Sequence, residues 1–184
     1  MSKKFKHISK SSEKFLEKYL NTPSPTGFES AGQKVWLDYI KPFIDSHIVD
    51  TYGSVVGIIN PEAKYKVVIE AHADEISWFV HYITENGFIY LRRNGGSDHQ
   101  IAPSKRVNIH TDKGAVKAVF GWPAIHTRLG GTKEEPPKTD NIFLDCGCKN
   151  KKEVEALGIH VGCVITYEDE FMILNKSYYV GRAL

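Results

Sequence analysis

Cysteine is scarce in this sequence, with three residues in 184. Cys146, Cys148 and Cys163 are too few and too unevenly spaced for the disulfide framework of a secreted scaffold or for a four-cysteine zinc site. A chain of this length can bury a hydrophobic core without such cross-links. Because free thiols are typical of a reducing compartment, we expect a cytoplasmic protein.

The sequence also lacks a long apolar run and an excess of charge of one sign. No stretch approaches the roughly 18 apolar residues of a membrane span, and the first residues do not show the pattern of a secretory leader. Lys and Arg number 24 against 22 Asp and Glu, which gives a formal net charge of +2. These charges are spread along the chain, so we expect neither a membrane nor a nucleic acid as partner.

The first part of the chain predicts two helices within an otherwise ordinary globular composition. Apolar residues recur at helical spacing over 12–20, where Ser11 or Ser12 is available as the N-cap. Two prolines follow and end this helix, because proline lacks an N–H and restricts the residue before it. Thr26 and Glu29 then have the spacing of a capping box, which predicts the start of a second helix.

From Ile48 onward the pattern changes to short strands. The continuous apolar run within 65–71 suits a strand that is covered on both faces, and Asn86-Gly87 is a strong hairpin signal. A third helix is expected at 151–157. The other expected strands are 55–59, 78–83, 88–92, 106–110, 116–120, 142–145, 163–167, 171–174 and 177–180. Helices and a buried strand followed by antiparallel β structure predict an α/β protein with a second, β-rich domain.

A His-x-Asp-Glu run, residues 72–75, directly follows the predicted buried strand. Because side chains alternate along an extended chain, His72 and Asp74 point to the same side and can serve one metal site or one acid/base pair. Imidazole is a common zinc ligand, and a neighbouring carboxylate can accept its second N–H. Taken alone, this short spacing favours a structural histidine hydrogen-bonded at the end of a strand.

Seven segments spread along the chain give this run a context. They are 23–29 (PSPTGFE), 50–54 (DTYGS), 71–76 (AHADEI), 95–98 (GGSD), 143–147 (FLDCG), 158–162 (GIHVG) and 180–184 (VGRAL). In this order they resemble the tetrahedral, deblocking and glutamyl aminopeptidases, a family of metallopeptidases of which some members were once labelled endoglucanases or cellulases.

The resemblance extends over essentially the whole chain and implies its fold. It implies part of an α/β/α metallopeptidase sandwich with an inserted, β-barrel-like dimerisation domain. Residues 1–76 would be the first part of the catalytic domain, 77–167 the insert, and 168–184 the return to the catalytic domain.

The resemblance also implies a site, cofactors and partners. His72 would be a ligand of one of two divalent metal ions, zinc or cobalt, and Asp74 the carboxylate that orients it. Such paired ions, about 3.5 to 4 Å apart, activate a water molecule and polarise the scissile carbonyl, and a glutamate moves the proton. The substrates would be peptides that lose their N-terminal amino acids, and dimers would assemble into a larger closed particle.

The sequence ends where the next metal ligand of this family is expected. In such enzymes the segment that corresponds to 181–184 leads directly into the aspartate that bridges the metals. Because one imidazole cannot hold a catalytic ion at useful affinity, we expect this chain alone to be inactive. We also expect the strand at 65–71 to lose its cover and the insert to be the better-ordered part.

Two other functions stay open. The chain could act as a truncated, non-catalytic oligomerisation or interaction module. It could also be a distant carboxypeptidase or aminoacylase, whose site likewise begins with His-x-Asp, although the segments 23–25 and 181–184 argue against this.

Other side chains have both a functional and a structural interpretation. Residues 146–148, Cys-Gly-Cys, could be a metal or redox pair, but buried free thiols are favoured because no partner pair exists. His126 lies in a long loop that reaches position 139, and loops of that length are often functional. Residues 168–170, Glu-Asp-Glu, are interpreted as a polar turn rather than a set of carboxylate ligands. The remaining candidates, interpreted as structural, are His81, His110 and His160.

Overall fold

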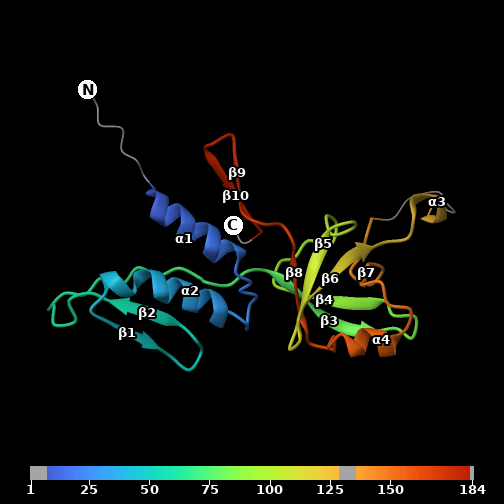
Figure 1. Ribbon diagram of the computed structural model, residues 1–184, viewed down its shortest axis with the longest axis horizontal. Helices are drawn as coiled ribbons and strands as arrows, with labels where there is room; N and C mark the ends of the chain where they lie inside the picture. The colour runs from blue at the N-terminus through green and yellow to red at the C-terminus, as the bar shows by residue number, and fades with distance from the viewer. Residues whose placement is uncertain (1–7, 129–135, 183–184) are drawn as a thin grey trace. The chain divides into compact units, whose positions relative to one another are not determined.

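The computed structural model of this protein describes residues 8–128 and 136–182, and the chain divides into two compact units (Figure 1). One, here called the α/β unit, comprises the residues up to Glu75 together with those from Glu170 onward. The other, here called the barrel unit, comprises Ile76–Asp169. Among the described residues, no helix is long and apolar enough to cross a membrane.

The two helices predicted for the first part of the chain are present. They are α1, Lys10–Asn21, and α2, Ser30–Ile40, which continues into the short 3-10 helix η1, Lys41–Phe43. The N-cap of α1 is Ser9 rather than Ser11 or Ser12, because the Ser9 hydroxyl accepts a hydrogen bond from the backbone N–H of Ser12 at 3.0 Å. The helices contact each other through the stacked rings of Phe15 and Tyr39, whose centroids are 3.9 Å apart.

The start of α2 differs from the predicted capping box. Glu29, not Thr26, occupies the N-cap position, and the Glu29 carboxylate accepts a hydrogen bond from the backbone N–H of Gly27 at 2.6 Å. The residues before the helix instead form a turn, in which the N–H of Phe28 donates to the carbonyl of Pro25 at 2.7 Å. The prediction was wrong because the Thr26 hydroxyl donates to a carboxylate elsewhere in the chain, Asp74.

Two antiparallel hairpins complete the α/β unit. They are β1, Ser46–Val49, with β2, Val55–Ile58, and β9, Met172–Leu174, with β10, Tyr178–Val180. An added Cβ at Gly57 would lie 2.7 Å from the Cδ1 atom of Ile40, so glycine permits the close packing of β2 against α2. The phenol of Tyr179 donates to the Glu13 carboxylate at 2.9 Å and thereby anchors the β9–β10 hairpin to α1.

The strand predicted at 65–71 is not formed, although the chain there is apolar. Val67, Val68 and Ile69 are 75%, 81% and 96% exposed, and the segment pairs with no other strand in the part of the chain that the structure describes. A strand buried on both faces requires neighbouring strands and covering layers, and the described residues supply neither for this segment. The exposure agrees with the expectation that this segment would lose its cover.

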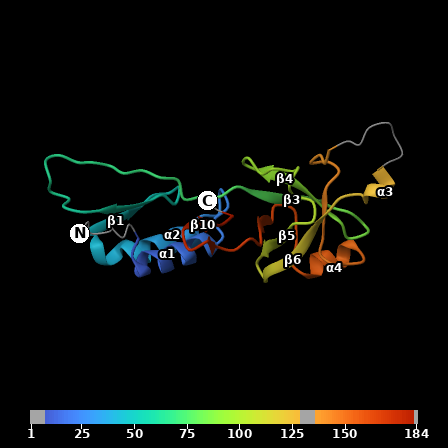
Figure 2. The ribbon, with the colours of Figure 1, turned by 90° about the horizontal axis from the view of Figure 1, so that it is seen from above.

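The barrel unit is built from six antiparallel strands that close on themselves (Figures 1 and 2). The strands are β3, Ser77–Ile83; β4, Ile89–Asn94; β5, Arg106–Thr111; β6, Gly114–Gly121; β7, Phe143–Asp145; and β8, Val164–Tyr167, in the order β3-β4-β7-β6-β5-β8. Asn86-Gly87 forms the predicted turn between β3 and β4, where Gly87 has a φ of 85°. Closure leaves no unpaired barrel edge, which removes the usual site of strand aggregation.

Two short helices accompany the barrel. α4, Lys151–Ala156, was predicted, and its N-cap is Asn150, whose side chain accepts a hydrogen bond from the N–H of Glu153 at 3.0 Å. α3, Ile125–Arg128, was not predicted, because a single turn is too short to show a helical period.

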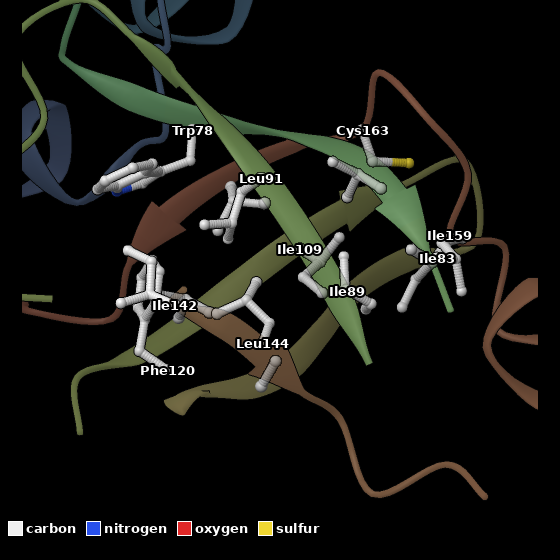
Figure 3. Close-up of a cluster of buried hydrophobic side chains, with 14 of the residues drawn as sticks. Trp78, Ile83, Ile89, Leu91, Ile109, Phe120, Ile142, Leu144, Ile159 and Cys163 are labelled. Atoms are coloured by element: carbon white, nitrogen blue, oxygen red, sulfur yellow. The ribbon is translucent and has the colours of Figure 1, made fainter. Parts of the chain in front are cut away.

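The core of the barrel unit is a continuous cluster of apolar side chains (Figure 3). Trp78 of β3 and Phe120 of β6 meet edge to face, with ring centroids 5.5 Å apart. Ile89, Ile109 and Leu144 are fully buried on three further strands. Alternate side chains of β4 and β5 point into this core. In β3 a bulge between Val80 and Tyr82 shifts the alternation, so that Ile83 is buried.

We expect Leu144→Ala to lower the free energy of unfolding of the barrel unit by about 2–5 kcal/mol, because it leaves a cavity in a fully buried position. Urea denaturation monitored by tryptophan fluorescence measures this loss. The matched control is Val119→Ala, on neighbouring β6 but 45% exposed, for which we expect less than about 1 kcal/mol. Equal losses for the two variants would contradict the assignment of the core.

We expect the backbone amides of 67–71 to exchange with solvent much faster than those of β5 and β8. The former have no strand partner among the described residues, whereas the latter pair with each other inside a closed sheet. Hydrogen exchange followed by mass spectrometry measures both segments in one experiment. Slower exchange in 67–71 than in β5 would show that this segment is paired.

Candidate functional site

The His-x-Asp-Glu run is held against the turn that precedes α2. The N–H of Glu75 donates to the carbonyl of Ser24 at 2.9 Å, and the N–H of Thr26 donates to the carbonyl of Glu75 at 3.2 Å. Pro25 lies between these two bonds, opposite Glu75 in a parallel bridge. Because the bridge uses the N–H groups of the residues around it, proline at this position costs no hydrogen bond.

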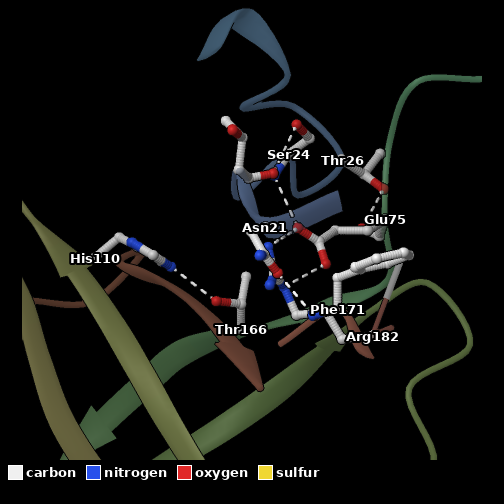
Figure 4. A network of polar contacts seen from close by, with 9 residues as sticks. Asn21, Ser24, Thr26, Glu75, His110, Thr166, Phe171 and Arg182 are labelled. Atoms are coloured by element: carbon white, nitrogen blue, oxygen red, sulfur yellow. Dashed lines mark hydrogen bonds and ion pairs between the residues drawn. The ribbon is translucent and has the colours of Figure 1, made fainter. Parts of the chain in front are cut away.

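A buried ion pair fixes the same region through its side chains (Figure 4). The Glu75 carboxylate accepts a hydrogen bond from Nη2 of Arg182, which lies 3.2 Å from Oε1. Nε of Arg182 lies 2.9 Å from Oε2 as an ion-pair contact. Oε1 also accepts the backbone N–H of Ser24 at 2.8 Å. The side chains of Glu75 and Arg182 are only 3% and 7% exposed, so each charge depends on the other.

Sequence reasoning placed Glu75 and Arg182 within matching segments but gave neither a role. Two sequence features could have indicated a buried pair. They are a carboxylate directly after an apolar segment and an arginine between small and apolar residues. Neither residue type is commonly buried unless it is paired. Only the tertiary structure shows that the two residues meet across 107 positions of the chain.

The predicted site residues His72 and Asp74 are in direct contact. Asp74 Oδ1 lies 3.0 Å from His72 Nδ1, and Asp74 Oδ2 accepts a hydrogen bond from the Thr26 hydroxyl at 2.6 Å. A carboxylate only accepts hydrogen bonds, so His72 Nδ1 carries a proton, and in the neutral ring Nε2 retains its lone pair. The side chains of His72 and Asp74 are 85% and 33% exposed.

The hydrogen bond from Thr26 is the largest cause that holds the pKa of Asp74 below its ordinary value. The contact with His72 lowers the pKa of Asp74 further, and partial burial opposes both effects. Asp74 is therefore ionised at neutral pH and available to orient the imidazole.

The described residues contain one pair, His72 and Asp74, whose chemistry suits a metal ligand and its orienting carboxylate. No group of three or more His, Cys, Asp and Glu side chains gathers at one point within 8–128 and 136–182. His72 nevertheless has the features of a ligand, because its Nε2 lone pair is exposed and its Nδ1–H is taken by a carboxylate. The donor set thus fits one ligand and its orienting partner.

The cysteines differ from the prediction of buried thiols. Cys163 is buried, whereas Cys146 and Cys148 are only partly buried, and all three are free. Partial burial and a hydrogen bond with Cys148 raise the pKa of Cys146 to about 11. A thiol with a raised pKa is a weak nucleophile at neutral pH, which agrees with a structural role for Cys146.

The other candidates are distributed over the barrel unit. His126 lies in α3, and the loop in which it was placed continues into residues 129–135, outside the described residues. His110 Nε2 lies 2.9 Å from the hydroxyl of buried Thr166, a structural contact (Figure 4). Glu168 and Asp169 lie between β8 and β9 and form ion pairs with Lys117 and Lys105, which agrees with the interpretation as polar residues between two strands.

The two units and the His72–Asp74 pair define an α/β chain, interrupted by a closed β-barrel, that carries a candidate metal-ligand pair. The sequence matches the family described as M42 glutamyl aminopeptidase over residues 53–184, and the chain belongs to this family. The resemblance seen in the seven segments is thereby confirmed.

Named proteins and solved structures are similar over most of the chain. Lysyl aminopeptidase of Pyrococcus furiosus is 26% identical over 164 residues, which cover 88% of this chain and 47% of the relative. The TET aminopeptidase of the marine sediment archaeon Thaumarchaeota archaeon SCGC AB-539-E09 matches with a TM-score of 0.85 at 24% identity, covering 91% of this chain and 46% of that one. The TET1 peptidase of Pyrococcus horikoshii matches with a TM-score of 0.79 at 26% identity, covering 93% and 51%.

These matches confirm the predicted α/β fold class with its β-barrel. The chain spans about half the length of the curated relatives it matches.

We expect Arg182→Met to lower the free energy of unfolding of the α/β unit by about 3–5 kcal/mol, because it leaves the buried Glu75 carboxylate without its partner. Urea denaturation monitored by helical circular dichroism measures the loss, since α1 and α2 are the longest helices. The matched control is Arg92→Met, which breaks an exposed ion pair with Asp140 and should cost less than about 1 kcal/mol. Adding Glu75→Gln to Arg182→Met should recover part of the loss, and no recovery would exclude an unpaired charge as its cause.

Proposed function

We propose that this protein is an aminopeptidase that releases N-terminal amino acids from peptides with the help of two bound divalent metal ions. The observation that carries the proposal is the match to the M42 glutamyl aminopeptidase family over 53–184, a range that includes the His72–Asp74 pair. The relatives are named aminopeptidases and peptidases, and one of them is named for lysyl residues. Peptides with a free amino terminus are the corresponding substrate class.

In this proposal His72 holds one metal ion through Nε2, and Asp74 holds the imidazole in the required tautomer. Zinc or cobalt suits an imidazole and carboxylate donor set. When bound, the paired ions supply an activated water and polarise the scissile carbonyl. The buried pair of Glu75 and Arg182 keeps the segment that carries His72 in place, since it anchors the residue next to Asp74. The remaining ligands and the general base belong to polypeptide outside the described residues.

We further propose that the barrel unit mediates association between copies of the protein. The Pyrococcus horikoshii relative is a peptidase that can assemble into a tetrahedron or a large octahedral shell. A closed barrel suits such a role, because all its strands are paired and association proceeds through side chains. A homo-oligomer built from dimers is the expected state, and a cytoplasmic location stays a prediction.

A second candidate function is a non-catalytic interaction module. The observation that favours it is the barrel unit, whose core is complete within Ile76–Asp169. A chain with this function would associate with its partner through the barrel, and its His72 would have no role in binding.

Activity and metal content of two forms of the protein test the proposal. One form is the 184-residue chain, and the other carries in addition the polypeptide that follows Leu184 in its reading frame. We expect the longer form to hydrolyse peptides with a free amino terminus but not their N-acetylated counterparts. A chelator should abolish this activity, and zinc or cobalt should restore it. We expect the 184-residue chain to be inactive because one imidazole binds a catalytic ion too weakly.

Variants of the longer form test the roles of individual residues in metal binding and activity. Asp74→Asn should lower activity or metal affinity by about 10- to 100-fold, as is typical when the partner of a ligand histidine is lost. His72→Ala should have at least that effect, whereas His47→Ala, on exposed β1, is the matched control and should have none. Preference for N-acyl amino acids would indicate an aminoacylase. Self-association without activity in either form would favour the interaction module.

A further inference from the structure

Thr26 contacts the His72–Asp74 pair from a part of the chain that lies 48 residues away from Asp74. Its backbone is already held, because its N–H donates to the carbonyl of Glu75 and the flanking Ser24 is bonded on both its N–H and its carbonyl. The hydroxyl of Thr26 makes a contact in addition to these backbone bonds.

The hydroxyl of Thr26 is directed to the carboxylate of Asp74. Thr26 Oγ1 lies 2.6 Å from Asp74 Oδ2, and its other acceptor, the carbonyl of Glu75, is 3.5 Å away. The shorter contact is typical of a hydroxyl that donates to an ionised carboxylate. Asp74 Oδ1 is left for His72 Nδ1, at 3.0 Å. The two oxygens of one carboxylate are thus divided between the threonine and the histidine.

This division restricts rotation of the Asp74 side chain. A partial rotation of the carboxylate about its Cβ–Cγ bond would weaken the contact with Thr26 and the contact with His72 together. His72 itself is 85% exposed, so packing does little to hold its ring. Nδ1 of His72 also lies 3.1 Å from the carbonyl oxygen of Asp74. The orientation and the tautomer of the imidazole consequently depend on these two Asp74 oxygens, and the position of the carboxylate depends on Thr26.

We propose that Thr26 is a positioning residue of the metal site, which locks the Asp74 carboxylate so that His72 keeps its proton on Nδ1 and presents Nε2 to the metal. This inference rests on the proposed function for its biological meaning. The chain of contacts from Thr26 through Asp74 to His72 exists without the metal, so it can be tested directly on the 184-residue protein.

The test is the tautomer of the His72 ring, read from its two ring-nitrogen chemical shifts by long-range proton–nitrogen correlation at a pH where the ring is neutral. Because the chain has eight histidines, His72→Gln identifies the signals. We expect the Nδ1–H form to predominate in the unsubstituted protein. Thr26→Val keeps the shape but removes the donor, and should lose most of that form. Thr26→Ser restores the hydroxyl and should restore the form.

Two controls separate the possible outcomes. Thr22→Val makes the same chemical change in the same unit, where the hydroxyl donates to the Lys18 carbonyl at 2.7 Å, and should leave His72 unchanged. Asp74→Asn removes the carboxylate charge and should lower the population of the Nδ1–H form, while the Asp74 carbonyl, 3.1 Å from His72 Nδ1, remains as an acceptor. If Thr26→Val does not fold, Thr26→Ala removes the same donor in its place.

An unchanged His72 tautomer in Thr26→Val, with the population of the form lowered in Asp74→Asn, would overturn the role of Thr26 and leave the proposed function intact. An unchanged tautomer in Asp74→Asn as well would contradict the assignment of Asp74 as the orienting carboxylate. Loss of the form in Thr26→Val that Thr26→Ser does not restore would also overturn the proposal, because the hydroxyl would not be its cause.

Discussion

The buried ion pair between Glu75 and Arg182 is the contact on which the rest of the candidate site depends. It joins a residue beside the His-x-Asp pair to a residue near the end of the sequence, and the carboxylate also accepts the N–H of Ser24. Both charged groups are almost fully removed from solvent, where a charge is tolerated only with its partner. The pair therefore specifies one arrangement of three segments that are far apart in sequence.

Local hydrogen bonds then fix the position of the imidazole relative to this ion pair. The backbone of Ser24 and Thr26 brackets Glu75, which sets Asp74 next to the Thr26 hydroxyl. Asp74 in turn faces His72. Each step is a hydrogen bond of ordinary length, and the last residue of the series is the most exposed. In the proposed function an exposed ligand is expected, because the site would accept a metal ion and a substrate. The orientation of His72 then comes from hydrogen bonds rather than from packing.

The two units are stabilised in different ways. The barrel unit buries a continuous apolar core, and closure of the barrel pairs each of its strands with a neighbour on both sides. The α/β unit combines two helices and two hairpins with an apolar segment, 67–69, that stays exposed. The apolar side chains of that segment gain stability only when other polypeptide covers them, since exposed Val and Ile side chains contribute little to a fold. The relatives are about twice as long as this chain, so they contain additional polypeptide that could cover such a segment.

The sequence by itself determined those features that depend on local pattern. Short β-rich runs separated by turns located the barrel strands, Asn86-Gly87 located a turn, and His72 and Asp74 were found from their spacing and from the family's motifs. The sequence did not determine the caps of the first two helices, because several serines and a threonine compete there and the outcome depends on where each hydroxyl finds its best acceptor. The strand expected at 65–71 failed for a similar reason, since an apolar run becomes a strand only when a partner is present. Only the tertiary structure decided that Thr26 bonds to Asp74 and that Glu75 pairs with Arg182, because a buried polar contact requires the chain to bring distant residues together.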